Sequence, residues 1–360
     1  MKSELKTILV QSPTRVDLAG GTLDLWPLYN FVGGATTVNL AIDIMTTVEL
    51  KERADSQIEL FSEDLNLKQT FKNLEECLAE KNEKLRLLQI QLEFWKPTQG
   101  LSLRTKSESP VGAGIGASSS LTVSLLKAFD LLVNGLKSDK FPQLANGNYQ
   151  NHIKKSRFAS VHELVNVAHN LEAQVLSTPT GTQDYYPAVT GGINILTYSA
   201  EGIQQEVFPV AGSEIEKYFL LVHTGKAHHS GINNFEVLTK AVNRDPEVLK
   251  ALHDLKTVAE EAASCCRKAE YLKLPALFQR EYAARIKLAK SFSSPEIEKL
   301  REVSLQAGAK AVKICGAGGG GCVLVWVSPD QRKDVVAACE RNGFKVLLAK
   351  PVPPKELQSL

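Results

Sequence analysis

The chain has 360 residues, 43% of them apolar and 23% charged, which is ordinary for a globular protein with room for two domains or lobes. Its 42 basic and 40 acidic side chains leave a formal net charge of +2, so no general field attracts nucleic acid or a membrane surface. No run approaches about 18 consecutive apolar residues, and the first residues lack the apolar core of a signal peptide. We therefore expect a cytoplasmic protein that binds neither nucleic acid nor membranes, with its six cysteines as buried thiols.

Short β-branched runs alternate with helical stretches along the chain, which predicts a mixed α and β protein. Residues 68–95 are charged and helix-prone, whereas residues 135–156 mix Gly, Pro, Asn and Lys and predict a surface loop. We place a lobe boundary near residue 200, which gives an amino-terminal lobe of residues 1–200 and a carboxy-terminal lobe of residues 201–360. Strands are predicted at 7–10, 36–42, 46–50, 101–105, 192–198, 218–223, 311–315, 322–327 and 345–348. Helices are predicted at 118–133, 159–176 and 332–341, with three more between 232 and 307.

The segment Pro110-Val-Gly-Ala-Gly-Ile-Gly-Ala-Ser-Ser-Ser120 carries three alternate glycines and leads into a predicted helix. Gly112, Gly114 and Gly116 allow the backbone to approach an anion closely, and the amide groups at a helix start favour phosphate. A Gly-Ser turn with a serine N-cap is the alternative. The segment lacks the GxxxxGK[ST] sequence and the GxGxxG spacing, so neither the P-loop nor the dinucleotide fingerprint applies.

A second glycine cluster, Gly316-Ala-Gly-Gly-Gly-Gly321, lies between two predicted strands. It contains GxGxxG, but that fingerprint needs a helix after the glycines, where a strand is predicted here. A tight β-hairpin is an alternative, although five glycines exceed what a hairpin turn requires. A backbone packed closely against a ligand explains the excess better.

Near the amino terminus, Ser12-Pro-Thr-Arg-Val-Asp-Leu-Ala-Gly-Gly-Thr-Leu-Asp24 predicts a strand that runs into a Gly-Gly turn. Arg15 precedes the turn and Asp24 follows it. The local sequence alone leaves open a surface arginine and a helix-capping aspartate.

Two carboxylates stand out between residues 159 and 186. Glu172 lies on the apolar stripe of a predicted helix, where a charge needs a cation or hydrogen-bond donors. This position predicts that Glu172 binds Mg²⁺, and the alternative is that Glu172 forms a structural salt bridge. Asp184 follows in a Pro/Gly turn that would bring this second carboxylate back past the end of the helix. The alternative is that the Asp184 side chain only caps a helix or forms an Asx-turn.

Together these segments resemble the signatures of the galactokinase, homoserine kinase, mevalonate kinase and phosphomevalonate kinase (GHMP) superfamily, in the same order and at about the same positions. The first resembles Pro-x-Arg-x-x-Leu-x-Gly-x-x-x-Asp, and the second resembles the Pro-x-Gly-x-Gly-Leu-Gly-Ser-Ser-Ser phosphate loop. Lys313 to Cys322 resembles the carboxy-terminal glycine motif. The resemblance covers nearly the whole chain. It implies the two-lobe α+β GHMP kinase fold, with an amino-terminal lobe like domain 2 of ribosomal protein S5 and a ferredoxin-like carboxy-terminal lobe.

The resemblance also implies transfer of the γ-phosphate of ATP to a hydroxyl, with Mg²⁺ as cofactor. Asp184 would take the hydroxyl proton, Arg15 would stabilise charge on the transferred group, and Ser118 with Glu172 would hold the metal. Adenine contacts are expected between about residues 56 and 103. The residues expected to bind the nucleotide are Pro110, Gly112, Ala113, Gly114, Ile115, Gly116, Ala117, Ser118 and Ser119. The residues expected to bind the substrate are Asp24, Gly181, Tyr185, Lys226, Gly318 and Gly319.

Within the superfamily, the chain resembles the sugar anomeric kinases, such as the D-glycero-D-manno-heptose 7-phosphate kinases, which share the Ala-Gly-Gly run and a segment like His223-Thr-Gly-Lys226. We therefore expect a sugar 1-kinase that acts on a sugar or sugar phosphate, as a monomer or homodimer. A mevalonate-type kinase is one alternative, although that branch usually has lysine in place of Arg15. A non-catalytic sensor of sugar or ATP is another, although a sensor has no need of a base.

Some positions depart from the family pattern. Ala117 replaces the first serine of the phosphate loop, which leaves Ser118 and Ser119 to supply hydroxyls. His228 lies near the place where the heptose phosphate kinases have an arginine, which weighs against a phosphorylated substrate. His228 and His229 form a donor cluster with Lys226 that would either bind an anionic substituent or be a solvated loop.

Overall fold

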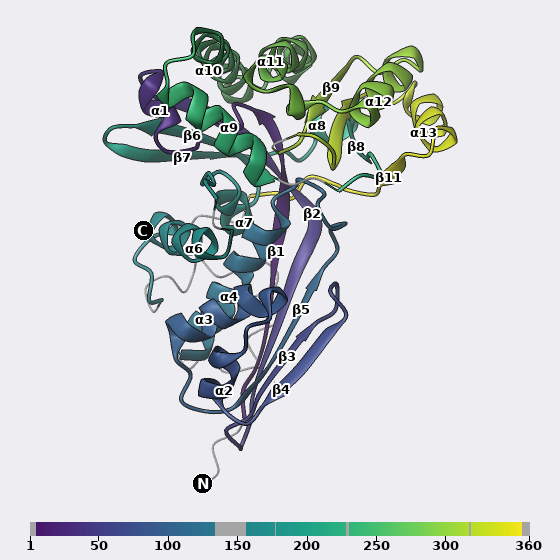
Figure 1. The fold of residues 1–360 in the computed structure, drawn as a ribbon. Coiled ribbons are helices and arrows are strands. Elements are labelled where there is room, and N and C mark those ends of the chain that lie inside the picture. The colour runs from purple at the N-terminus through teal and green to yellow at the C-terminus, as the bar shows by residue number, and fades with distance from the viewer. Residues whose placement is uncertain (1–4, 134–155, 177, 228–229, 317, 355–360) are drawn as a thin grey trace.

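The computed structural model describes residues 5–133, 156–176, 178–227, 230–316 and 318–354, and at 230–232 it describes the backbone alone. The molecule is elongated and has two lobes, through which two long strands run (Figure 1). These strands are β1 (Thr7–Ala19) and β2 (Ala35–Glu52), paired antiparallel over most of their length. The mixed α and β architecture predicted from the sequence is confirmed.

The larger sheet has seven strands, in the order β4-β3-β5-β2-β6-β7, with β1 on the other edge of β2. Strand β2 is long enough to pair with β6 along residues 35–40 and with β5 along residues 46–52. Strands β3 and β5 are parallel, and the other pairings are antiparallel. The remaining strands are β3 (Ile58–Ser62), β4 (Leu67–Phe71), β5 (Leu101–Ser107), β6 (Ile193–Ser199) and β7 (Gly202–Phe208).

Helices cover one face of this sheet (Figure 1). Helix α4 (Ala117–Val133) packs directly on β1 and β2, because Leu125, Leu126 and Phe129 on its apolar stripe are fully buried. Helices α3 and α6 pack against α4. The helices of this lobe are α1 (Leu28–Phe31), α2 (Leu74–Ala79), η1 (Glu83–Leu85), α3 (Arg86–Trp95), α6 (Val161–Leu176) and α7 (Tyr185–Thr190), together with α4.

The second lobe contains an antiparallel four-stranded sheet in the order β11-β8-β10-β9. Helix α11 packs against β9, and α10 packs against β1 and β2, so the larger sheet also supports this lobe. The strands are β8 (Phe219–His223), β9 (Ala311–Ile314), β10 (Cys322–Trp326) and β11 (Lys345–Leu347). The helices are α8 (Glu214–Tyr218), α9 (Ser230–Val242), α10 (Pro246–Arg267), η4 (Tyr271–Lys273), α11 (Leu274–Leu288), η5 (Lys290–Phe292), α12 (Pro295–Gln306) and α13 (Arg332–Arg341).

Several sequence predictions need correction. The strands expected at 36–42 and 46–50 are one continuous strand, β2. The region 68–95 is not all helix, because β4 occupies residues 67–71 as the edge strand of the sheet. Among the described residues, four α-helices rather than three lie between 230 and 307. Strands β3 and β7 were not predicted, and the lobe boundary near residue 200, which falls in the β6–β7 hairpin, stays a prediction.

Other predictions concern the cysteines, one loop and membrane-spanning helices. All six cysteines lie in the described ranges, where they are buried and free, as predicted. The loop predicted at 135–156 lies almost wholly outside the described residues. Within the described part of the chain, no helix is both long and apolar enough to cross a bilayer.

Four buried charges join the second lobe to β1. Asp17 accepts hydrogen bonds from Arg285 of α11 and from Lys313 of β9, each at 3.1 Å. Glu281 lies one turn before Arg285 and pairs with both cations, at 2.5 and 3.2 Å. Burial alone would raise the pKa of Asp17, but Lys313 and Arg285 lower it below its usual value, so the carboxylate stays ionised. We call these four residues the buried charge cluster.

Removing one member of the cluster should be costly. We expect Arg285→Met to lower the free energy of unfolding by about 3–5 kcal/mol, because two carboxylates would remain buried beside one lysine. The matched control is Arg280→Met on the same helix, where Arg280 pairs with Glu261 at the surface. Urea denaturation should show a change of less than about 1 kcal/mol for the control. Equal losses in the two variants would contradict a stabilising role for the cluster.

Candidate active site

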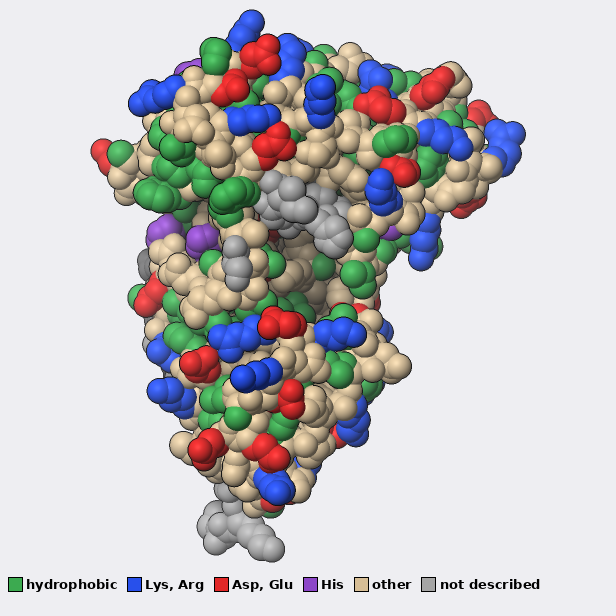
Figure 2. All heavy atoms as spheres, in the orientation of Figure 1, with side chains coloured by type: hydrophobic (Ala, Val, Ile, Leu, Met, Phe, Trp, Pro, Cys, Tyr) green, Lys and Arg blue, Asp and Glu red, His purple; other side chains and the backbone are tan. Residues whose placement is uncertain are grey.

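A cavity of about 480 Å³ opens where the larger sheet meets the second lobe, and the space-filling view shows a hollow in this part of the molecule (Figure 2). Its walls come from β1, β5, the 110–116 loop, the start of α4, the end of α6 and the segment 178–184. The second lobe contributes Asn234 of α9 and Gly316. Segments that are far apart in sequence therefore meet at one site.

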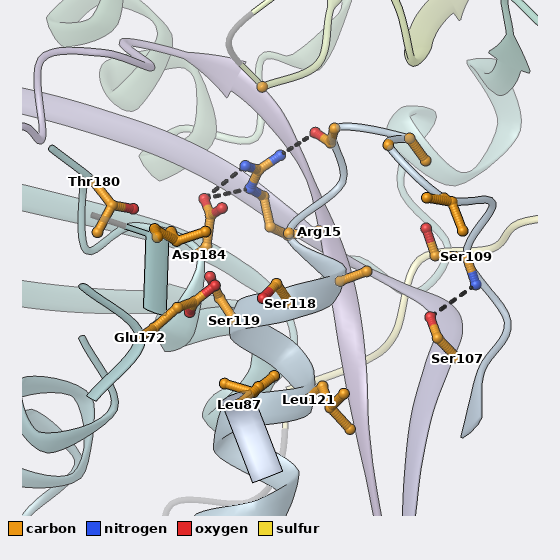
Figure 3. A pocket seen from close by; sticks show the side chains of 18 of the residues that line it. Arg15, Leu87, Ser107, Ser109, Ser118, Ser119, Leu121, Glu172, Thr180 and Asp184 are labelled. Atoms are coloured by element: carbon orange, nitrogen blue, oxygen red, sulfur yellow. Dashed lines mark hydrogen bonds and ion pairs between the residues drawn. The ribbon is translucent and has the colours of Figure 1, made fainter. Parts of the chain in front are cut away.

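The predicted phosphate loop forms one wall of the cavity. Gly112, Gly114 and Gly116 all have positive φ angles, of 67°, 70° and 71°, a conformation that favours glycine. Helix α4 begins at once, and the first amide groups of a helix have no partner within the helix. Ser118 and Ser119 line the cavity (Figure 3). Ser120 instead points into the protein, where it donates to the Ser12 carbonyl at 3.0 Å.

The second glycine cluster supports this loop from behind. A Cβ added at Gly316 would come within 2.6 Å of the Gly114 carbonyl oxygen, so only glycine fits there. At the other end of the cluster, the Cys322 amide donates to the Ala113 carbonyl at 2.7 Å. The cluster also connects β9 and β10, which pair antiparallel. This pairing agrees with the β-hairpin that the sequence left open as an alternative. Of its described glycines, Gly316 lines the cavity.

Arg15 on β1 is held between two segments (Figure 3). Its Nε donates to Asp184 Oδ1 at 2.7 Å, and its Nη2 lies 2.6 Å from the same oxygen. Its Nη1 donates to the Gly114 carbonyl at 2.9 Å. Burial alone would lower the pKa of Arg15, but Asp184 and Asp17 raise it above its ordinary value, so the guanidinium stays charged although it is only 4% exposed.

Asp184 lies directly before α7 and is more accessible than its partner, with 24% of its side chain exposed. Its Oδ1 is occupied by the Arg15 guanidinium. Its Oδ2 lies beside the phosphate loop, because a Cβ added at Gly116 would be 3.3 Å from that oxygen. The ion pair therefore fixes one oxygen of the carboxylate and leaves the other next to the start of α4.

Glu172 reaches the cavity from α6 and is 2% exposed. In Figure 3 its carboxylate points toward Ser118 and Ser119. Burial raises the pKa of Glu172 above its usual value, while the nearby hydroxyls of Ser118, Tyr185 and Ser119 act in the opposite direction. Its Oε2 has no hydrogen-bond partner in the described structure, and such a buried carboxylate oxygen is costly without a cation or donor.

These residues fit Mg²⁺. A carboxylate and a hydroxyl are the hard oxygen ligands that this ion prefers, and in nucleotide sites it commonly uses one or two carboxylates together with phosphate oxygens and water. No group of three or more His, Cys, Asp or Glu side chains in the described ranges could form an all-protein metal site. A bound cation would give the buried Glu172 Oε2, which has no hydrogen-bond partner in the described structure, the partner that it lacks.

Asp24 occupies the end of the cavity near the 178–184 segment. Its Oδ2 accepts a hydrogen bond from the Gln183 amide at 3.1 Å, and a Cβ at Gly181 would overlap its carboxylate. Burial and the nearby Asp184 raise the pKa of Asp24 to about 7, and the Gln183 amide opposes this shift. Asp17 also raises this pKa, and Arg15 lowers it.

The structure brings most of the predicted site residues together, but not all of them. Ile115 is buried and does not line the cavity. Tyr185 is fully buried next to Glu172. Gly318 and Gly319 pack against Phe292, whose carbonyl accepts the Gly319 amide at 2.9 Å.

Of the predicted donor cluster near residue 226, the structure describes Lys226, which does not line the cavity. Lys226 is half exposed and forms an ion pair with Glu296 at 3.3 Å. His228 and His229 lie outside the described residues.

The cavity extends away from Asp184 to a part that no motif predicted. Its lining residues there are Ser62, Asp64, Leu65, Lys84, Leu87, Leu88, Thr105 and Ser107. The first six lie in the range 56–103, where adenine contacts were expected. They come from the end of β3 and the turn after it, from η1 and from α3, and nothing in their spacing distinguishes them from other surface positions.

Two stretches of the chain match a known family. Residues 82–192 match the GHMP kinases N terminal domain, and residues 248–345 match the GHMP kinases C terminal region. Together they make up more than half of the chain. The chain belongs to the GHMP kinase family. The family and the two-lobe fold predicted from the sequence are thereby confirmed.

Similar proteins differ in the acceptor that their names give. The chain is 26% identical to a D-glycero-alpha-D-manno-heptose 7-phosphate kinase of Campylobacter jejuni, over 94% of each chain. It is 23% identical to a mevalonate kinase of Methanocaldococcus jannaschii, over 94% of this chain and 98% of the relative. Its fold is similar to that of Lactococcus lactis galactokinase in complex with galactose, with a TM-score of 0.71, 18% identity and coverage of 98% and 94% of the two chains.

The raised pKa of Asp24 predicts a pH-dependent contribution to stability. The folded chain holds the proton up to about pH 7, whereas an unfolded aspartate releases it near its ordinary pKa of 3.8. Asp24 therefore stabilises the fold at low pH relative to high pH, and this advantage is lost as the pH rises through about 7. We expect the free energy of unfolding of the wild type, minus that of Asp24→Asn, to fall between pH 5 and pH 7. A difference that stays constant in urea denaturation across this range would contradict the pKa assignment.

Proposed function

We propose that this GHMP kinase transfers the γ-phosphate of ATP to a hydroxyl group of a sugar or sugar derivative. The observation that carries the proposal is that a phosphate-binding loop, a buried arginine and two carboxylates converge on one cavity. Phosphoryl transfer depends mainly on positioning and on neutralising charge, and this arrangement supplies both. A sensor would need the loop, but it would not need a carboxylate held beside it.

The phosphate loop would hold the β- and γ-phosphates. Gly112, Gly114 and Gly116 let its backbone come close to the anion, and the start of α4 directs unpaired amides and the positive end of its dipole toward it. Ser118 and Glu172 would hold Mg²⁺. The ion would supply neutralisation of charge on the β- and γ-phosphate oxygens.

The nucleotide base would lie at the other end of the cavity. Leu65, Leu87 and Leu88 offer apolar walls there, and Thr105 and Ser107 offer hydroxyls at the edge. An aromatic base fits such a mixture, in which apolar contact supplies affinity and a few polar groups set orientation.

Asp184 would act as the general base. The acceptor oxygen forms a bond to the γ-phosphorus, the bond from that phosphorus to the β–γ bridging oxygen breaks, and the hydroxyl proton passes to Asp184 Oδ2. Oδ1 stays bound to Arg15, which keeps the carboxylate oriented. Arg15 lies between this base and the phosphate loop, and its fixed charge would stabilise the transferred group.

The acceptor would bind next to Asp184, at the end lined by Asp24. A sugar hydroxyl is a hydrogen-bond donor, and the Asp24 carboxylate is an acceptor fixed by the Gln183 amide. The likeness to galactokinase and to the heptose phosphate kinase supports a sugar as the acceptor.

The mechanism can be tested by removing the base. We expect Asp184→Asn to lower kcat by about 10²–10⁴-fold in an assay of ADP release with an accepted sugar. Binding of Mg·AMP-PNP, measured by calorimetry, should be largely retained, because the loop is unchanged. Asp330→Asn, which alters an exposed turn far from the cavity lining, is the control and should leave kcat unchanged. Near-normal turnover in Asp184→Asn would remove this residue from the mechanism, and no ADP release from the wild type with any acceptor would contradict the proposed function.

A further inference from the structure

The acceptor end of the cavity contains two carboxylates close together. Asp24 Oδ2 accepts a hydrogen bond from the amide of Gln183, the residue directly before Asp184, and both carboxylates line the cavity. Asp24 is only 5% exposed and is fixed by the Gln183 amide, so it cannot turn away into solvent. Any acceptor must lie against both of them.

Uncharged polar groups also line this end of the cavity. Thr22, Thr180, Gln183 and Asn234 line the cavity there with hydroxyl and amide groups. Such groups exchange hydrogen bonds with hydroxyls, and carboxylates accept from them. The set therefore suits a molecule that presents several hydroxyl donors.

No lysine or arginine among the described lining residues is left to bind an anion at the acceptor end of the cavity. Among the described residues, Arg15 and Lys84 are the lysine and arginine side chains in its lining. Arg15 is committed to Asp184 and the Gly114 carbonyl, and Lys84 belongs to the part assigned to the nucleotide base. Lys226, which the sequence suggested as an anion ligand, is paired with Glu296.

We propose that the acceptor is an uncharged, polyhydroxylated sugar rather than a sugar phosphate or a hydroxy acid. This inference rests on the proposed function and narrows it. An anionic substituent at this end of the cavity would be repelled by the Asp184 carboxylate and, above about pH 7, by Asp24 as well, and no lysine or arginine among the described lining residues here is left unengaged to pair with it. A free sugar would satisfy the same carboxylates with its hydroxyls. Among the acceptors in the names of the similar proteins, heptose 7-phosphate and mevalonate carry a negative charge, and galactose does not.

Matched pairs of acceptors test the proposal. D-mannose, D-galactose and D-glycero-D-manno-heptose would each be compared with its 6- or 7-phosphate, and L-fucose and mevalonate would be added. ADP release gives kcat/KM, and calorimetry in the presence of Mg·AMP-PNP gives Kd independently of turnover. We expect at least one free sugar to have a kcat/KM at least about tenfold above, and a Kd at least about tenfold below, those of its phosphate and of mevalonate.

A charge-removing variant supplies a second measurement. In an assay above the raised pKa of Asp24, at about pH 8, Asp24→Asn loses a strong acceptor and one negative charge. We therefore expect kcat/KM for the free sugar to fall by roughly 10–100-fold while that for the phosphate does not fall. The preference for the free sugar should therefore shrink. Glu236→Gln on α9 is the control, because it removes the same charge from an exposed helix position that pairs with Lys240 and does not line the cavity. In Glu236→Gln, the ratio of kcat/KM for the free sugar to that for its phosphate should equal the ratio in the wild type.

The outcomes separate this inference from the proposed function. Turnover of a sugar phosphate with a kcat/KM equal to or above that of the free sugar overturns the inference and leaves the sugar kinase function in place. Turnover of mevalonate alone overturns both. If no acceptor is turned over, the proposed function fails, and the calorimetric Kd values then decide the inference: tighter binding of the phosphate, or no binding of any free sugar, contradicts it.

Discussion

The Arg15 guanidinium makes contacts in two directions that set the geometry of the site. On one side it binds Asp184, and on the other it binds the carbonyl of Gly114 in the phosphate loop. Asp17 adds a second negative charge on the same strand, so the guanidinium stays ionised despite its burial. Because arginine retains its charge under all ordinary conditions, this bridge holds the candidate base beside the loop before any ligand binds.

The bridge keeps its shape because the surrounding backbone is fixed from the second lobe. Gly316 packs against Gly114, and Arg285 donates to the carbonyls of Gly316 and Gly21, at 3.3 and 3.1 Å. Arg285 belongs to the buried charge cluster, so the same ionic contacts that join the lobes also hold the turn before Asp24 and the support of the phosphate loop. Stability and the arrangement of the site therefore depend on overlapping interactions.

Much of this could be predicted from sequence because the relevant signals are local. Alternating glycines before a helical pattern singled out the 110–116 loop, and a carboxylate on an apolar stripe singled out Glu172, and both line the cavity. The extra length of β2 and the buried charge cluster could not be predicted, since each depends on contacts between distant segments. Asp17, Glu281, Arg285 and Lys313 look like ordinary surface charges in one dimension. Gly318 and Gly319 were expected to let the backbone pack closely against a ligand, but in the structure they pack against Phe292.

The central claim is that Arg15, Asp184, Glu172 and the 112–119 segment meet on one triphosphate. A crystal structure of the protein with Mg·AMP-PNP measures this most directly. We predict that the γ-phosphate lies on the phosphate loop, with Mg²⁺ bound to Glu172 and Ser118 and with Arg15 still bridging Asp184 to the loop. A nucleotide bound elsewhere, or an Arg15 side chain turned away from both Asp184 and the phosphates, would contradict the claim.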